Sequence, residues 1–261
     1  MKTEFTMTFQ YASDLHLEFS ENREWLHTHP LEPGADVLLL AGDVLPLHLV
    51  PKHRKLLNEI AQPFKEVIWI PGNHEYYGNS IPPEGDDLDM QPLAKWRIVN
   101  NRSVQIGTAR ILCTTLWTAI SQLNETHMRH SMNDYLQIRH GGKLLLPAHT
   151  TRLHQRSLAW LKAELAKPFA GPTVVMTHHV PTMMHYPERF KGDALNEAFA
   201  VELHDLIHAS DIHTWIYGHH HHNTPAFTIG GTCMRTNQVG YVQYGEQRSF
   251  DRGGCFGVEG N

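Results

Sequence analysis

Short apolar runs recur along the chain, and each ends in a cluster of polar residues. The runs are rich in β-branched and aromatic residues, and turn-forming residues follow them directly. Because such runs are typical of buried strands, the pattern predicts strands at 8–12, 37–41, 67–70, 174–176 and 214–217.

Segments with helical spacing lie between some of these runs. Residues 51–60 start with a proline and stop before Pro63, as helices commonly do. Residues 149–166 and 195–207 place leucines and other apolar residues at helical intervals. Strands alternating with helices predict an α/β fold built from strand–helix–strand units.

The middle of the chain is less regular. Residues 79–91 are rich in Pro, Gly and acidic residues and predict a loop, while 104–106 and 110–117 predict a hairpin. Residues 118–147 form a weakly patterned insertion, and 226–244 predict two or three further strands. Since no repeat or linker interrupts the chain, we expect one domain, 1–261, with a loop-rich insertion at about 118–147.

The polar clusters at the strand ends contain residues that bind metals. In open α/β sheets, ligands bind beyond the carboxyl ends of strands, so these clusters are expected to meet. Residues two apart on extended chain point the same way, which would place both members of D-x-H or H-x-H on one ion. Each cluster taken alone is explained at least as well by a turn. His220 is expected to point away from the site. Taken together, the clusters predict a metal site. The predicted ligands are Asp14, His16, Asp43, Asn73, His178, His219 and His221.

Composition narrows the class of protein. The chain has 261 residues, 21 histidines, a net charge of −5 and three separated cysteines. The negative charge argues against nucleic acid as partner without excluding it, and the cysteines predict no disulfide framework. Without a leader or an apolar span, the sequence predicts a soluble cytoplasmic protein.

These motifs resemble the calcineurin-like metallophosphoesterase superfamily. The resemblance covers residues 14–221 and includes Asp14-x-His16, Gly42-Asp43, 72–75 (G-N-H-E), His178 and 218–221 (G-H-x-H). It implies a four-layer α/β/β/α sandwich with a dinuclear metal centre. Asp14, His16 and His221 would bind one metal ion, and Asn73, His178 and His219 the other. Asp43 would bridge the two ions, and His74 would be the catalytic histidine.

Departures from branches of the superfamily refine this interpretation. Residues 44–47 (V-L-P-L) follow Gly42-Asp43, where protein serine/threonine phosphatases continue with Asp, Arg and Gly. Pro46 occupies the place of the iron-binding tyrosine of purple acid phosphatases. His74 stands where lipid A pathway pyrophosphatases have arginine, and its presence distinguishes the chain from the retromer subunit of this fold. The superfamily's DNA-repair nucleases are usually longer.

The resemblance predicts an enzyme, a metal-dependent phosphoric ester hydrolase. We expect a metal-bound hydroxide to attack a phosphomonoester or phosphodiester, while His74 protonates the leaving oxygen. Glu75 is expected to support the fold or the ligands. The mixed nitrogen and oxygen ligands suit two divalent ions, with Mn or Fe favoured on family grounds and Zn, Co or Ni also suitable.

Substrate contacts are expected in loops at the same sheet edge. The substrate would be a phosphorylated small molecule or a nucleotide, and no membrane is expected as partner. The candidates are His179, Asn133, Tyr135, Arg139 and Arg189, with Asn237 and Tyr241 as possible borders of the pocket. Three alternatives stay open: a nonenzymatic metal-containing interaction module, a nuclease or cyclic-nucleotide phosphodiesterase of the superfamily, and an α/β domain whose polar clusters are only turns.

Overall fold

Two six-stranded sheets form the centre of the protein. The computed structural model describes residues 6–259. The first sheet has the order β15-β1-β2-β3-β6-β5, with bounds Cys255–Glu259, Thr6–Ala12, Val37–Leu40, Glu66–Trp69, Trp96–Asn100 and Leu88–Leu93. The second has the order β13-β14-β12-β11-β8-β7, with bounds Phe227–Ile229, Thr232–Thr236, Thr214–Tyr217, Thr173–Thr177, Ala109–Thr114 and Arg102–Ile106.

The central strands of both sheets are parallel, so the loops that leave them emerge at one edge. Strands β1, β2, β3 and β6 pair in parallel in the first sheet, as do β8, β11, β12 and β14 in the second. The five strands predicted from apolar runs are therefore confirmed. They are β1, β2, β3, β11 and β12, and each is followed by one of the polar clusters.

The sheets pack face to face over an apolar core. Phe9 and Leu39 from the first sheet meet Ile111, Val174 and Met176 from the second, and all five are fully buried. This explains why the predicted strands are continuous apolar runs rather than alternating ones, because parallel strands covered on both faces must be apolar throughout.

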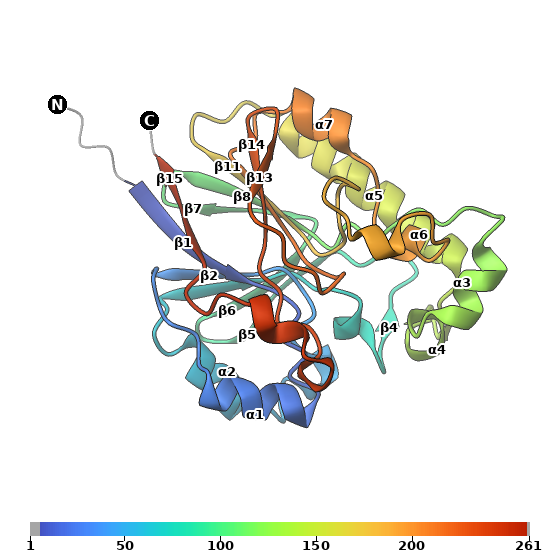
Figure 1. Cartoon of the computed structure of the whole chain (residues 1–261), viewed down its shortest axis with the longest axis horizontal. Coiled ribbons are helices and arrows are strands. Elements are labelled where there is room, and N and C mark those ends of the chain that lie inside the picture. Colours follow the sequence, from blue (N-terminus) through green and yellow to red (C-terminus); the bar gives the residue numbers. More distant parts are fainter. Residues whose placement is uncertain (1–5, 260–261) are drawn as a thin grey trace.

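Helices cover the outer faces of the two sheets (Figure 1). Helices α1 (Ser20–Thr28) and α2 (Arg54–Ala61) cover the first sheet, and α5 (Pro147–Leu165) and α7 (His204–Ala209) cover the second. Each helix layer has its own core, with Leu26 and Leu57 buried on the first side and Leu161 and Ile207 on the second. The expected α/β/β/α sandwich is confirmed.

Several predicted elements differ from the observed ones. Residues 79–91 contain β4 (Ser80–Ile81) and the start of β5, which sits at a sheet edge with mostly exposed side chains and therefore lacks an apolar run. The helical pattern of 195–207 is split into α6 (Asn196–Phe199) and α7, because Ala200 forms a β-bridge with Val180 between them. The tail contains two strands, β13 and β14, and the sequence pattern missed β6 and β15.

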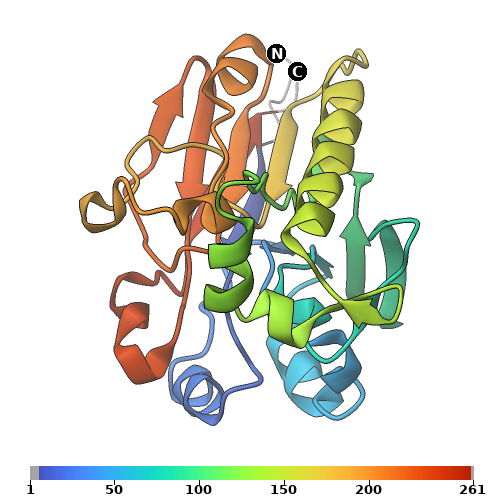
Figure 2. The same ribbon diagram turned by 90° about the vertical axis from the view of Figure 1, so that its right-hand side faces the viewer.

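The insertion at 118–147 is more ordered than predicted. It contains α3 (Glu125–Ser131), α4 (Asp134–Gln137), β9 (Arg139–His140) and β10 (Lys143–Leu144), and the two strands join β4 in a small sheet. Figure 2 shows α3 and α4 in front of the sheets, beside the lower half of α5. A separate apolar cluster that includes Trp117, Met128 and Tyr135 holds this segment in place.

Candidate metal centre and pocket

The predicted ligands meet at the carboxyl edge of the two sheets, but the backbone that presents them is not extended. Five of them have left-handed φ angles: 55° at Asp14, 46° at His16, 54° at Asp43, 77° at His219 and 48° at His221. The pairs D-x-H and H-x-H therefore do not lie on the extended chain that the sequence predicted, although their side chains do meet. Non-glycine residues with positive φ are uncommon, and clusters of them are found at functional sites.

One group of side chains is formed by Asp14, His16 and His221. Nε2 of His16 lies 3.0 Å from Nε2 of His221, and that nitrogen lies 3.3 Å from Oδ1 of Asp14. Asp14 and His16 are fully buried. A carboxylate and two imidazoles from distant parts of the chain thus face one point.

The other group is formed by Asp43, Asn73, His178 and His219. Nε2 of His178 lies 3.4 Å from Oδ2 of Asp43, 3.1 Å from Oδ1 of Asn73 and 3.1 Å from Nδ1 of His219. His178 is fully buried, and its Nδ1 lies 2.9 Å from the carbonyl of Ala41. If Nδ1 donates its proton to that carbonyl, the Nε2 lone pair is directed into the site.

Asp43 connects the two groups. Its Oδ2 is 3.4 Å from Nε2 of His178 and 3.8 Å from Nε2 of His16. In both Asp14-His16-His221 and Asp43-His178-His219, the potential donor atoms lie within 4.8 Å of one another. Two places where imidazole nitrogens face each other, joined by a carboxylate, fit a pair of divalent cations.

The electrostatics of the site also favour cations. Burial lowers the pKa of His178, but the Asp43 carboxylate outweighs it and raises that pKa to about 9. Burial opposes protonation of His221 too, yet hydrogen bonds to Asp14 and Glu246 raise its pKa to about 10. Protons and metal ions compete for the same lone pairs, so a field that holds a proton on these imidazoles is one in which a metal ion would be stabilised.

His74, the predicted catalytic residue, lines the pocket next to these groups. Its Nδ1 is 2.7 Å from Oε1 of Glu18, and its Nε2 is 3.2 Å from the hydroxyl of Tyr241 and 4.0 Å from Oδ2 of Asp43. The ring stacks on Tyr77 with centroids 4.1 Å apart. Burial lowers the pKa of His74, but Asp43 and Glu18 outweigh it and raise the pKa, which favours the imidazolium form.

Three carboxylates that were not among the predicted site residues contact the candidate ligands from outside the two groups. Oε1 of Glu18 lies 3.2 Å from Nδ1 of His16, Oε2 of Glu246 lies 2.7 Å from Nδ1 of His221, and Oδ1 of Asp134 accepts a 2.8 Å hydrogen bond from Nδ2 of Asn73. Glu18 follows D-x-H at the same spacing of two, which was a usable signal. Glu246 and Asp134 lie far from the motifs and gave none.

Glu75 acts as a structural clamp, as expected. It is fully buried and accepts hydrogen bonds from the amides of Asp43 (3.0 Å), Val44 (2.7 Å) and Gly72 (2.6 Å) and from the Trp69 indole (2.8 Å). Burial, reinforced by the Asp43 charge, raises its pKa to about 8. The side chain therefore ties the loop after β2 to the loop after β3.

Only part of the predicted substrate set lines the pocket. Asn133 and Arg189 do, and Tyr241 does as well. His179, Tyr135 and Arg139 do not line it. His179 is buried with Nδ1 3.1 Å from the carbonyl of Thr115, Tyr135 is buried with its hydroxyl 3.2 Å from that of Thr150, and Arg139 is exposed and donates to the carbonyl of Gly142.

Two residues treated as peripheral in the sequence also have defined places. His220 belongs to neither ligand group; it is buried, stacks on Tyr186 with centroids 5.6 Å apart, and lines the pocket. Asn237 does not line the pocket, because its amide is used to bind the carbonyls of Tyr11 and Asp251.

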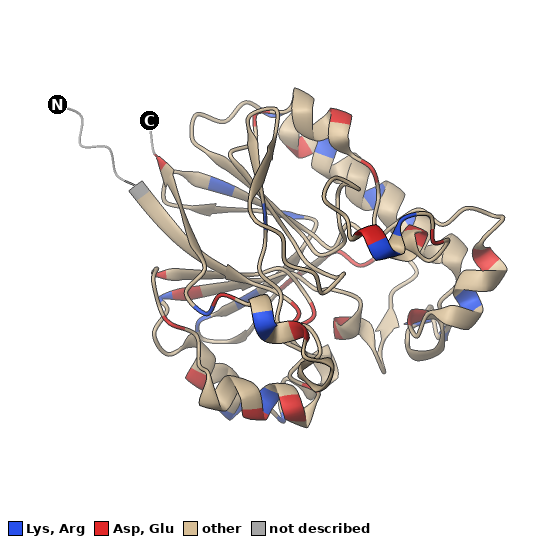
Figure 3. Ribbon diagram, in the orientation of Figure 1, with Lys and Arg blue, Asp and Glu red and all other residues tan. Residues whose placement is uncertain are grey.

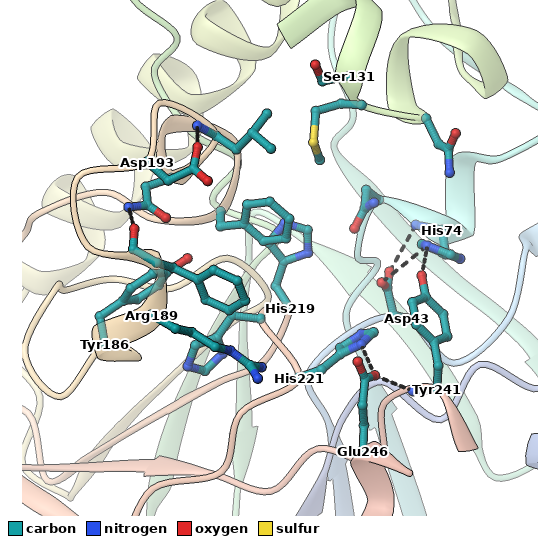
Figure 4. A pocket seen from close by; sticks show the side chains of 18 of the residues that line it. Asp43, His74, Ser131, Tyr186, Arg189, Asp193, His219, His221, Tyr241 and Glu246 are labelled. Atoms are coloured by element: carbon teal, nitrogen blue, oxygen red, sulfur yellow. Dashed lines mark hydrogen bonds and ion pairs between the residues drawn. The ribbon is translucent and has the colours of Figure 1, made fainter. Parts of the chain in front are cut away.

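The pocket has a volume of about 380 Å³ and extends well beyond the candidate ligands. Figure 4 shows Asp43, His74, Tyr241 and Glu246 on one side and Asp193 and Ser131 on the other. The far side is formed by the insertion and by the segment between β11 and α7. A site for metal ions therefore opens into a larger cavity.

Comparison with known proteins identifies the class. Residues 7–223 match the calcineurin-like phosphoesterase family, and the chain belongs to this family. An uncharacterized protein of Acanthamoeba polyphaga mimivirus is 28% identical to this chain over an aligned length of 261 residues. The alignment covers 89% of this chain and 90% of the viral protein.

Solved structures align with the chain at lower sequence identity. Phosphopantetheinyl hydrolase (PptH) from Mycobacterium tuberculosis aligns with a TM-score of 0.67 and 19% identity over 93% of this chain and 92% of its own. A dimetal phosphatase from Danio rerio aligns with a TM-score of 0.41 and 14% identity over 89% of this chain and 87% of its own. At these identities the likeness to PptH shows the fold.

Charge and hydropathy add two observations. In the view of Figure 3, Lys and Arg alternate with Asp and Glu along the outer helices. Among residues 6–259, no helix is both long and apolar enough to cross a bilayer.

Proposed function

We propose that this protein is a hydrolase that uses two divalent metal ions to cleave a phosphomonoester or phosphodiester. The position of Asp43 carries the proposal, since its Oδ2 lies within 4 Å of His16 on one side and His178 on the other. Membership of the calcineurin-like phosphoesterase family supports the same reaction class.

The ligand roles follow the two groups of side chains. Asp14, His16 and His221 would hold one ion, Asn73, His178 and His219 the other, and Asp43 would be shared between them. When bound, such ions supply Lewis acidity, which polarises phosphoryl oxygens and acidifies water. The mixture of imidazole nitrogen with carboxylate and amide oxygen suits Mn, Fe, Zn, Co or Ni, and we favour Mn or Fe on family grounds.

The protein's own part in the reaction centres on His74. Glu18 fixes the ring through Nδ1, so that Nε2 faces the pocket beside Asp43. An imidazolium there can donate its Nε2 proton to the oxygen that leaves phosphorus. Tyr241, whose pKa is raised by burial, keeps a neutral hydroxyl 3.2 Å from the same nitrogen and orients it.

The test combines metal content with turnover. The wild type, purified with Mn, is expected to bind two ions and to hydrolyse p-nitrophenyl phosphate or its bis ester. Asp43→Ala should lose both ions and activity. His74→Ala should keep both ions and lose turnover by about 10²–10⁴-fold, because only the proton donor is removed.

A matched control is available on the surface. His130 is exposed on α3, and His130→Ala should change neither metal content nor turnover. A wild type that binds metal ions but hydrolyses neither ester would support the nonenzymatic alternative. If His74→Ala lost its metal ions, the role given to His74 would be wrong.

A further inference from the structure

The far part of the pocket is lined by apolar side chains, here called the apolar arm. It consists of Met132, Tyr186, Phe190, Leu195 and Phe199. Phe199 stacks on His219 with centroids 4.8 Å apart, so the arm is continuous with the candidate metal centre. A phosphate group alone would fill only a small part of a cavity of about 380 Å³.

The arm is built before any ligand arrives. Phe190 packs against the core of the second sheet, Met132 and Leu195 pack against the core of the insertion, and Phe199 contacts both. All four are half-buried and also line the pocket. The backbone amide of Leu195 donates a 2.9 Å hydrogen bond to Asp193, which fixes the turn that carries the arm.

Outside the candidate metal centre, the pocket has few groups that would bind a strongly anionic ligand. Among the described residues that line it, Arg189 is the only Lys or Arg, and its guanidinium carbon lies 4.6 Å from the ring centroid of Phe190. Asp193 and Glu246 line the same pocket. Proteins that bind polyphosphates or nucleic acid place several cations along the ligand, and the described lining outside the candidate metal centre has one, Arg189.

We infer that the apolar arm binds the uncharged apolar or aromatic group of an ester that carries a single phosphate. The inference rests on the proposed function, because it places the phosphate at the metal ions. Apolar pockets with a few polar groups bind ligands by burying their apolar surface, and the polar groups at the metal end then fix the orientation. Nucleoside polyphosphates and oligonucleotides would be poor ligands.

A series of phosphonates tests the inference by binding alone, without depending on turnover. The head group stays constant across the series while the attached group changes. Titration calorimetry on the Mn-loaded protein would compare methylphosphonate, phenylphosphonate and 1-naphthylmethylphosphonate, with inorganic triphosphate as the polyanion. We expect affinity to rise about tenfold or more from the methyl to the naphthylmethyl compound, since each buried apolar carbon adds to binding. Triphosphate should bind more weakly than the naphthylmethyl compound.

Variants on opposite walls locate the effect. Met132→Ser and Phe190→Ser should each reduce the gain from the naphthyl group several-fold and leave methylphosphonate binding unchanged. The matched control is Leu136→Ser, since Leu136 lies on α4 outside the pocket and is 62% exposed. Thermal unfolding would show that the variants fold.

The outcomes separate the two proposals. Equal affinity for all phosphonates would overturn the apolar arm and leave the hydrolase standing, and tightest binding of triphosphate would overturn the expectation that polyanions are poor ligands. The expected ranking without hydrolysis of any phosphate ester would support the arm and count against the hydrolase.

Discussion

The loops at the sheet edge and the apolar arm share one pocket but are built differently. The loops hold their side chains on left-handed backbone, clamped by Glu75 and supported by Glu18 and Glu246. The arm consists of four half-buried side chains and the buried Tyr186, carried by segments between sheet strands that contain only short helices. We therefore expect the candidate metal centre to tolerate almost no change in shape. The arm should tolerate changes of its side chains better, except at Phe199, which stacks on His219.

A single methyl group in the loops should have the largest effect. A Cβ on Gly72 would overlap Oδ1 of Asp43 and lie 2.6 Å from Nε2 of His178, so Gly72→Ala must displace two candidate ligands. We expect turnover to fall at least about 100-fold, because small misplacements of reacting groups cost that much. Gly231→Ala is the matched control, since a Cβ there meets nothing within 4 Å. A Gly72→Ala enzyme with wild-type metal content and rate would refute the contrast.

Asp134 crosses the boundary between the two regions and should have the next largest effect. It belongs to α4 of the insertion, yet Oδ1 accepts hydrogen bonds from Asn73 and from the hydroxyl of Tyr77, both at 2.8 Å. It therefore turns the carbonyl oxygen of Asn73 towards His178. Asp134→Ala is expected to weaken Mn binding about 10–100-fold, as loss of such supporting partners generally does.

The neighbouring tyrosine provides the control for Asp134. Tyr135→Phe removes only a hydroxyl that contacts Thr150, so Mn affinity measured by calorimetry should stay at the wild-type value. Unchanged affinity in Asp134→Ala would mean that the insertion is independent of the metal centre.

Asp86 should alter stability alone and leave metal binding untouched. It is buried under the insertion and accepts a 2.7 Å hydrogen bond from the Trp117 indole. Burial raises its pKa from 3.8 to about 6. The Asp86 carboxyl therefore lowers the free energy of unfolding progressively as pH rises from 3.8 to 6, and by a constant amount above pH 6. Asp86→Asn removes this effect. Its stability gain over the wild type should be greater at pH 8 than at pH 5 by on the order of 1 kcal/mol.

Urea unfolding of metal-free protein at the two pH values measures this difference directly. Metal-free samples are needed because protons and metal ions compete at the histidines. A gain that is the same at both pH values would show that the Asp86 carboxyl titrates normally.

How much the sequence could predict depended on how local each signal was. The five central strands and the seven candidate ligands belong to short motifs of an apolar run followed by polar residues, and these were readable. Edge strand β5 was not, because its exposed side chains leave no apolar pattern. Asp134 and Glu246 were not assigned, because their partners Asn73 and His221 are distant in sequence and only the folded chain brings them together.

The placement of the predicted substrate residues could not be read from the sequence for the same reason. Tyr135 and Arg139 lie on the chosen insertion, but a helix and a strand there turn Tyr135 into a separate core and Arg139 to the surface. The loop prediction for 118–147 gave no way to see which side chains face the pocket. Both Asn133, at the start of α4, and Arg189, within the 3-10 helix Glu188–Phe190, line the pocket.

The left-handed ligands have a consequence for the cell. A histidine or aspartate in that conformation costs free energy that glycine would avoid, and here five such residues gather in one place. A cation that binds only the native arrangement offsets that cost by mass action. The amount of intact protein should then follow the free divalent metal ions available to it, so that starvation for them would lead to its proteolysis even while its synthesis continues.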